Sequence, residues 1–205
     1  DACIHNGVIY VLFFANPELP GVAHLQEHQY RLYVSTDNGK TFQLRSVLPF
    51  QSTKHCFYGN FVFTPDNRLM VYIYDELDEH NLKFLESSDE GRTWGTPRRI
   101  FFAKKIRNPQ IVYFEDRYFM HGRSGSFGEN AENFVLYTSP DGKQWDEGTY
   151  LFMKKPGCGA GSYSNNVIAH MPGQPRLLIQ ASKAYRDCRT NIVQYTITKK
   201  REKDI

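Results

Sequence analysis

The chain has 205 residues, enough to bury a sizeable hydrophobic core in one large domain or two small ones. With 25 Lys and Arg against 22 Asp and Glu, its formal net charge is +3, so no nucleic acid or other polyanion is an expected partner. The longest apolar run, from Val8 to Ala15, is far shorter than the about 20 residues of a membrane span, so no such span is expected.

Four successive units each begin with two apolar runs separated by polar turn residues, and this pattern predicts β-hairpins. The predicted strand pairs are, in chain order, 2–4 with 8–14, 60–63 with 69–74, 110–113 with 118–120, and 166–168 with 177–179. A third strand-like run follows each hairpin, at 31–34, 82–85, 134–137 and 191–198. No apolar pattern with the helical period competes with this interpretation.

A short motif of the form Ser-x-Asp-x-Gly-x-Thr-aromatic closes the first two units, at 35–42 and 87–94. A third copy, at 139–145, lacks one residue before its glycine. The aspartates of the three copies, Asp37, Asp89 and Asp141, are separated by two equal intervals of 52 residues. Small antiparallel sheets repeated at about this period are typical of the blades of a β-propeller.

We therefore predict an all-β fold: a β-propeller of four-stranded antiparallel blades, forming a single domain over residues 1–205. The blade-like units are expected at 1–52, 53–105, 106–158 and 159–205. In each motif the serine hydroxyl and the aspartate carboxylate can bond backbone N–H groups of a tight turn, and the glycine supplies a positive φ. Because the motif recurs in blades that cannot share one active site, we interpret its aspartates as turn locks.

This motif is the Asp box of the sialidase superfamily, and the chain resembles that superfamily over most of its length. The resemblance implies a six-bladed ring, of which this chain would supply about four blades. The segment 159–167 is similar to the sialidase segment that carries the tyrosine nucleophile, with Tyr163 at the matching position. The resemblance therefore implies an exo-acting hydrolase that cleaves a terminal, acidic sugar by a retaining mechanism with Tyr163 as nucleophile.

A nucleophilic phenol needs a base, because its ordinary pKa is about 10. Asp75 or Glu76, at the end of the predicted strand 69–74, is the most available base. The two residues also belong to an acidic stretch, 75–79, and the structural alternative is a solvated loop. For Tyr163 the structural alternative is a ring buried in the core.

In a propeller the inner strands start, and the second strands end, at one mouth of the central channel. We therefore expect a substrate-binding set there, made of Arg107, Arg123, His121, Tyr58 and Asn165. Guanidinium groups pair well with the carboxylate of an acidic sugar, which would make the two arginines its anchors. The alternative for Arg107 is an ion pair with an acid of a neighbouring blade.

Two other functions stay open on the sequence. One is a non-catalytic propeller that binds a glycan or a protein. The other is a propeller glycosidase that uses paired carboxylates, since residues 107–111 are faintly similar to inner-strand motifs of such enzymes. The expected partner of an enzyme of either class is a carbohydrate, and no cofactor is expected.

No metal site is expected either. His24, Glu27 and His28 match a zinc-binding pattern, but that pattern needs a helix to bring both histidines to one face. The segment follows Pro20-Gly21 and runs directly into a predicted strand. The four cysteines are too far apart in the chain for a zinc-site spacing.

Overall fold

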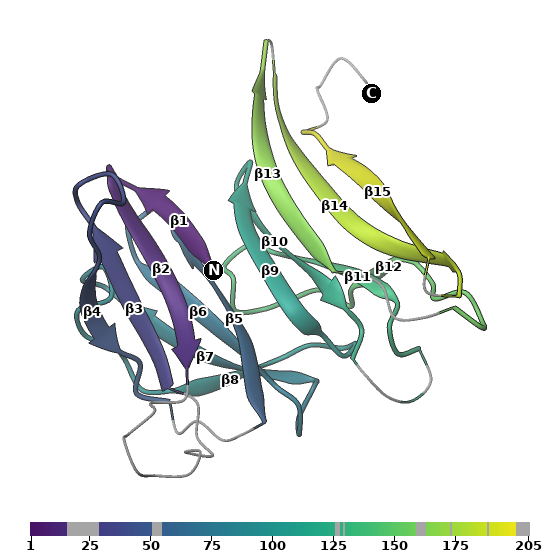
Figure 1. Cartoon of the computed structure of the whole chain (residues 1–205), viewed down its shortest axis with the longest axis horizontal. Helices are drawn as coiled ribbons and strands as arrows, with labels where there is room; N and C mark the ends of the chain where they lie inside the picture. Colours follow the sequence, from purple (N-terminus) through teal and green to yellow (C-terminus); the bar gives the residue numbers. More distant parts are fainter. Residues whose placement is uncertain are drawn as a thin grey trace. The chain divides into compact units, whose positions relative to one another are not determined.

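The computed structural model describes residues 1–15, 29–50, 55–125, 128, 130–158, 163–172, 174–187 and 189–199. The described residues form antiparallel sheets of strands that follow one another in the chain (Figure 1). The chain divides into two compact units, Asp1–Phe101 and Phe102–Ile205, with two sheets in each. Within the described part, no helix is long and apolar enough to cross a membrane. The zinc-like segment, His24 to His28, lies outside the described residues.

The first unit consists of two four-stranded sheets. The strands of its first sheet are β1 (Ala2–His5), β2 (Val8–Ala15), β3 (Gln29–Ser35) and β4 (Gln43–Val47). The strands of its second sheet are β5 (Cys56–Phe63), β6 (Leu69–Asp75), β7 (Asn81–Ser87) and β8 (Arg98–Phe101). Neighbouring strands pair in chain order in both sheets, as expected for consecutive hairpins.

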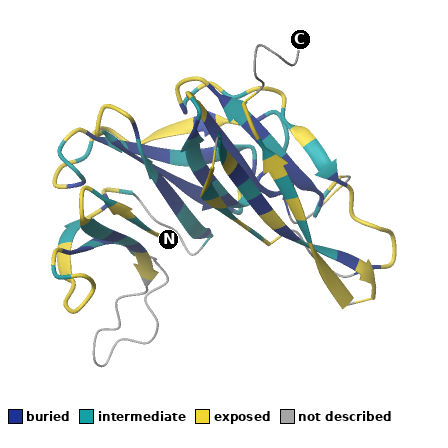
Figure 2. Ribbon diagram, turned by 90° about the horizontal axis from the view of Figure 1, so that it is seen from above, coloured by how far each residue is buried: buried dark blue, intermediate teal, exposed yellow. Residues whose placement is uncertain are grey.

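The core of the first unit follows from the alternation of side chains along its strands. Leu12 of β2 pairs with Leu32 of β3, and both lie in one buried cluster with Phe61, Val71 and Ile73 of the second sheet. Side chains of this size each stabilise the fold by about 1.5–3 kcal/mol when fully buried. Figure 2 shows the buried residues along inner strands such as β6, whereas outer strands such as β15 are largely exposed.

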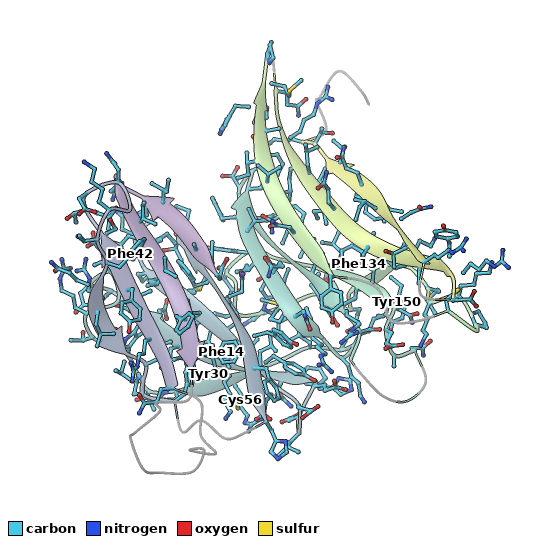
Figure 3. The ribbon with its side chains drawn as sticks, in the orientation of Figure 1. Phe14, Tyr30, Phe42, Cys56, Phe134 and Tyr150 are labelled. Atoms are coloured by element: carbon cyan, nitrogen blue, oxygen red, sulfur yellow. The ribbon has the colours of Figure 1, made fainter. Side chains whose placement is uncertain are left out.

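The second unit pairs a four-stranded sheet with a three-stranded one. The strands of the four-stranded sheet are β9 (Arg107–Phe114), β10 (Arg117–Arg123), β11 (Phe134–Ser139) and β12 (Thr149–Phe152). The other sheet consists of β13 (Ser164–Met171), β14 (Gln174–Arg186) and β15 (Arg189–Ile197). Phe134 of β11, labelled in Figure 3, packs in one cluster with Phe119, Leu177 and Ile179.

The structure corrects one feature of the predicted blades. Three of the described sheets have four strands. The last sheet has only three among the described residues, and β15 is its final strand. The predicted hairpins are confirmed, with longer strands than the apolar runs alone indicate.

The repeated motif forms the turns after β3, β7 and β11, and its hydrogen bonds confirm the turn-lock prediction. In the second copy the Ser87 hydroxyl donates to Asp89 (2.7 Å) and accepts from the Gly91 N–H (2.8 Å). The Thr93 hydroxyl and N–H both donate to Asp89, at 2.6 and 2.8 Å, and these bonds are the main reason that the pKa of Asp89 lies at about 2. In the shortened third copy, Asp141 accepts from the N–H groups of residues 143 and 144.

Candidate functional site

In the first unit, the end of β6 and the start of β5 bring several expected site residues together. Cys56 pairs with Asp75 across the two strands, and the Glu76 N–H donates to the His55 carbonyl oxygen at 2.9 Å. This backbone pairing places Asp75 and Glu76 beside the first residues of β5.

Asp75 is a buried carboxylate held by cations. Its side-chain oxygens accept from the Leu77 N–H (3.1 Å) and from the Arg99 guanidinium (3.3 Å), and the Lys83 ammonium lies 3.7 Å away. The same ammonium is 3.0 Å from the sulfur of Cys56. A buried carboxylate is stable in its charged form when cations and N–H donors surround it. The Asp75 side chain is therefore held in place at this strand end by Arg99, Lys83 and a backbone N–H group.

Glu76 has different surroundings, although it is the next residue. Its side chain is about one-third exposed, at 34%, and its Oε2 atom lies 3.4 Å from Nδ1 of His55. Asp75 is the last residue of β6, a strand that is buried throughout, whereas Glu76 begins the turn that follows, and this explains why one carboxyl group is enclosed and the other is accessible. The Glu76 carboxyl group is therefore accessible to a molecule from solution and can exchange a proton with it.

Tyr58 occupies an irregular position in β5. The pairing with β6 shifts between Phe57 and Gly59, so Tyr58 is an extra residue in the strand, with a positive φ of 37°. Its ring lies 6.2 Å from the ring of Tyr74. A side chain on Gly59 would meet Ile73 and Leu12, so the bulge is tied to close packing of the two sheets behind it. Tyr58, Asp75 and Glu76 thus lie at the same end of one sheet.

In the second unit, the two expected arginines lie opposite each other. Arg107 at the start of β9 pairs with Arg123 at the end of β10, and the strand register shifts between His121 and Arg123. Gly122 lies at this irregularity, and a Cβ there would be 2.6 Å from the Arg107 carbonyl oxygen. Because glycine permits this close backbone approach, Gly122 fixes the backbone positions from which the side chains of Arg107 and Arg123 extend.

Tyr163 lies over the guanidinium of Arg123, with 5.4 Å between Cζ and the ring centre. Arg123 is only 5% exposed, and its other neighbour is the carboxylate of Glu132, at 3.8 Å. Glu132 also forms an ion pair with Lys154. Tyr163 itself is 55% exposed, and within the described residues of this unit its hydroxyl has no hydrogen bond to a carboxylate. Tyr163 therefore presents an aromatic surface above a buried cation.

His121 is completely buried, and burial lowers its pKa to about 3. Its Nδ1 atom lies 2.9 Å from the Ser164 hydroxyl, and its Nε2 atom lies 3.1 Å from the side-chain amide nitrogen of Asn166. Because an amide nitrogen only donates, Nε2 accepts and the proton of the neutral ring is on Nδ1. His121 therefore donates to Ser164 and cannot act as its base, so this serine is not an activated nucleophile.

Asn165 lies on the other face of β13. Its neighbours Ser164 and Asn166 bond His121, whereas Asn165 is exposed and its side-chain oxygen accepts from the Asn166 N–H at 2.8 Å. The residues that bond His121 were not among the expected site residues. The two-residue alternation along β13 is the signal that separates them from Asn165.

The structure therefore forms two sets of expected site residues, one in each unit. The first set consists of Tyr58, Asp75 and Glu76. The second set consists of the remaining expected residues, namely Arg107, His121, Arg123, Tyr163 and Asn165. Lys83, Arg99 and Glu132 complete the charge pattern of these sets, and sequence spacing did not single them out as site residues. Lys83 lies on β7, Arg99 on β8, and Glu132 in the connection before β11. Pairing of the strands brings them to the site, so their role depends on the folded sheet.

Neither a family model nor a curated protein matches this sequence. Solved structures do match it. A protein of unknown function from Dyadobacter fermentans has a TM-score of 0.68 at 14% identity, covering 96% of this chain and 51% of that one. An α-L-arabinanase of Penicillium chrysogenum complexed with arabinobiose has a TM-score of 0.59 at 13% identity, covering 95% and 60%. An exo-1,5-α-L-arabinanase from a bovine ruminal metagenomic library has a TM-score of 0.60 at 12% identity, covering 98% and 76%.

At these identities the matches establish the fold: an all-β propeller similar to the five-bladed propellers of glycoside hydrolase family 43. The chain spans 51% and 60% of the length of the first two structures. The sialidase resemblance is wrong, and with it the six-bladed ring and the retaining mechanism with Tyr163 as nucleophile. The resemblance misled because its motif locks a turn, and a turn lock carries no information about the chemistry at a distant strand end.

Proposed function

We propose that this chain belongs to a propeller glycosidase that hydrolyses arabinose-containing oligosaccharides with carboxylates and inversion of configuration. The fold similarity to arabinanases supports the reaction class, and the related structures include complexes with arabino-oligosaccharides. The observation that carries the proposal is the contrast between Asp75 and Glu76. Two adjacent carboxyl groups in different surroundings can have different tasks: the accessible one can exchange a proton, whereas the enclosed one is held by cations beside it.

In this proposal Glu76 is the catalytic residue that exchanges the proton. Its exposure lets it reach a glycosidic oxygen or a water, and His55 holds one of its oxygens in place. Asp75 is held by ion pairs with Lys83 and Arg99, so in this proposal it has a structural role beside Glu76. Inversion uses two carboxyl groups about 6.5–9.5 Å apart, so Glu76 works with a second carboxyl group across the sugar.

In this proposal the second unit has a sugar-binding set of its own, made only of residues of that unit. Tyr163 offers an exposed ring for contact with a sugar face, and Arg107 and Asn165 offer polar groups to its hydroxyls. Arg123 and His121 are buried, so they are positioning residues: Arg123 supports the Tyr163 ring, and His121 holds the start of β13. Tyr58 is assigned a binding role beside Glu76.

The test is hydrolysis of an arabino-oligosaccharide by the chain and by a Glu76→Gln variant, which keeps the shape and removes the ionisable group. We expect turnover to fall by about 10²–10⁴-fold, the usual contribution of a general acid or base. Glu90→Gln, on the second repeated turn, is the matched control and should leave turnover unchanged. NMR of the first product should show inverted anomeric configuration. Full turnover by Glu76→Gln, or retention, would contradict the proposal.

A second candidate function is glycan binding without hydrolysis, and one observation favours it. In the second unit the carboxylate beside Arg123 and Tyr163 belongs to Glu132, and it is occupied by ion pairs with Arg123 and Lys154. Such a site can bind a glycan, but its carboxylate is engaged in ion pairs and does not serve as a catalytic acid. Equal oligosaccharide affinity of the chain and of Glu76→Gln, with no turnover by either, would establish this alternative.

A further inference from the structure

A groove of about 520 Å³ lies in the first unit, beside the second repeated turn. Its lining includes Arg68, Glu86, Thr93, Trp94, Thr96 and Arg98. Glu86 pairs with Met70 near the start of β6, whereas Asp75 is at the end of that strand. At the rise of a β-strand, the five residues from Met70 to Asp75 span about 17 Å. The groove is therefore separate from the site around Glu76.

The charged groups of the groove balance one another. The Glu86 carboxylate lies between two guanidinium groups: Arg68 donates to Oε1, and Arg98 lies 3.5 Å from Oε2. Arg68 also donates to Asp66 at 2.8 Å. Arg98 is 57% exposed, and its guanidinium also lies over the Phe84 ring, with Cζ 5.2 Å from the ring centre. The groove therefore offers donors and acceptors side by side without a strong net charge.

Trp94 supplies the apolar part of the groove, and its ring is held in one orientation. The indole N–H donates to the Ser46 hydroxyl at 2.9 Å, and that hydroxyl donates to the Gly91 carbonyl oxygen at 2.6 Å. The ring also packs against the core of the unit. A rigid, half-buried indole loses little conformational entropy when it meets a ligand.

The ionic cluster is not a component of the turn lock. Fifty-two residues earlier, the first repeated turn has the same lock, made by Ser35, Asp37 and Thr41. In that copy Val34 stands at the position of Glu86, and Ser46 stands at the position of Arg98. The turn therefore forms without these charges, and the cluster at the second turn needs another explanation.

We propose that this groove is a binding site for a neutral oligosaccharide, distinct from the hydrolytic site. Sugar hydroxyls donate and accept hydrogen bonds, so they match alternating guanidinium and carboxylate groups. The C–H face of a sugar ring fits against an indole. Because Glu86 and Asp66 compensate the two arginines, the site gives no strong preference for an anion. Because the groove is open, it can accept several consecutive sugar units of an oligosaccharide.

The test measures binding in a Glu76→Gln background, so that turnover cannot consume the ligand. The chain has two tryptophans, and Trp145→Phe leaves Trp94 as the only indole reporter. The probes are neutral hexasaccharides of pentoses and of hexoses, with oligogalacturonate as the acidic comparison. We expect the neutral probes, and not oligogalacturonate, to change the Trp94 emission, with matching heat in calorimetry.

Arg98→Ala and Glu86→Gln should each weaken this binding by about tenfold or more, as expected for loss of hydrogen bonds to a charged group. Arg92→Ala is the matched control, because Arg92 is an exposed arginine of the same turn that pairs with Glu90 and does not line the groove. Binding of oligogalacturonate alone, no binding of the neutral probes, or insensitivity to both groove variants would overturn the proposal. Failure of hydrolysis alone, with groove binding intact, would count only against the proposed function.

Discussion

The buried imidazole of His121 makes the stability of this chain depend on pH in a calculable way. The ring is enclosed in the second unit, and burial lowers its pKa from 6.5 to about 3. The folded protein therefore keeps His121 neutral at pH values where the unfolded chain protonates it. The stability linked to this residue is fully present above about pH 6.5 and is lost as the pH falls towards 3.

The size of the effect follows from the same shift. Each pKa unit corresponds to about 1.36 kcal/mol, so lowering the pH from 8 to 5 should cost about 2 kcal/mol of unfolding free energy through His121. Replacing His121 with Gln removes the titrating group. The variant is expected to be less stable at pH 8, because it disturbs the bonds to Ser164 and Asn166, but its stability should fall less steeply between pH 8 and pH 5.

Urea denaturation at pH 8 and pH 5 measures both quantities for the chain and the variant. His170→Gln is the matched control, since His170 is an exposed residue of β13 and its imidazole contacts solvent in both states. If His121→Gln has the same pH dependence as the unmodified chain, the reasoning that links burial of this ring to stability is refuted.

Two further predictions concern the packing and turns of the first unit. Asp89→Ala should lower the unfolding free energy by about 1–2 kcal/mol, as loss of a capping side chain does; equal melting temperatures by calorimetry would count against the turn lock. Gly59→Ala should cost about 1–3 kcal/mol in chemical denaturation, because its Cβ would lie 2.6 Å from Ile73 and 2.9 Å from Leu12; an unchanged midpoint would show that the sheets can move apart.

The sequence alone determined the sheets and the turns of this protein. Alternating apolar residues and polar turn residues act between neighbours in the chain, so hairpins such as β5–β6 could be predicted from local patterns. The repeated motif likewise contains all the groups of its own lock, from Ser87 to Thr93. Its resemblance to the sialidase superfamily is contradicted by the similar solved structures, because a turn of this kind can close a blade in propellers of different families.

Tertiary structure decided the surroundings of each candidate residue. Asp75 and Glu76 are equivalent acids in the sequence. Asp75 is enclosed because sheet pairing brings Lys83 of β7 and Arg99 of β8 to it, whereas Glu76 stays partly exposed in the turn after β6. The burial of His121 and the position of Tyr163 over Arg123 likewise depend on contacts between residues about 40 positions apart. Chemical environment is set by such long-range contacts and by strand irregularities, which a pattern of neighbouring residues does not encode.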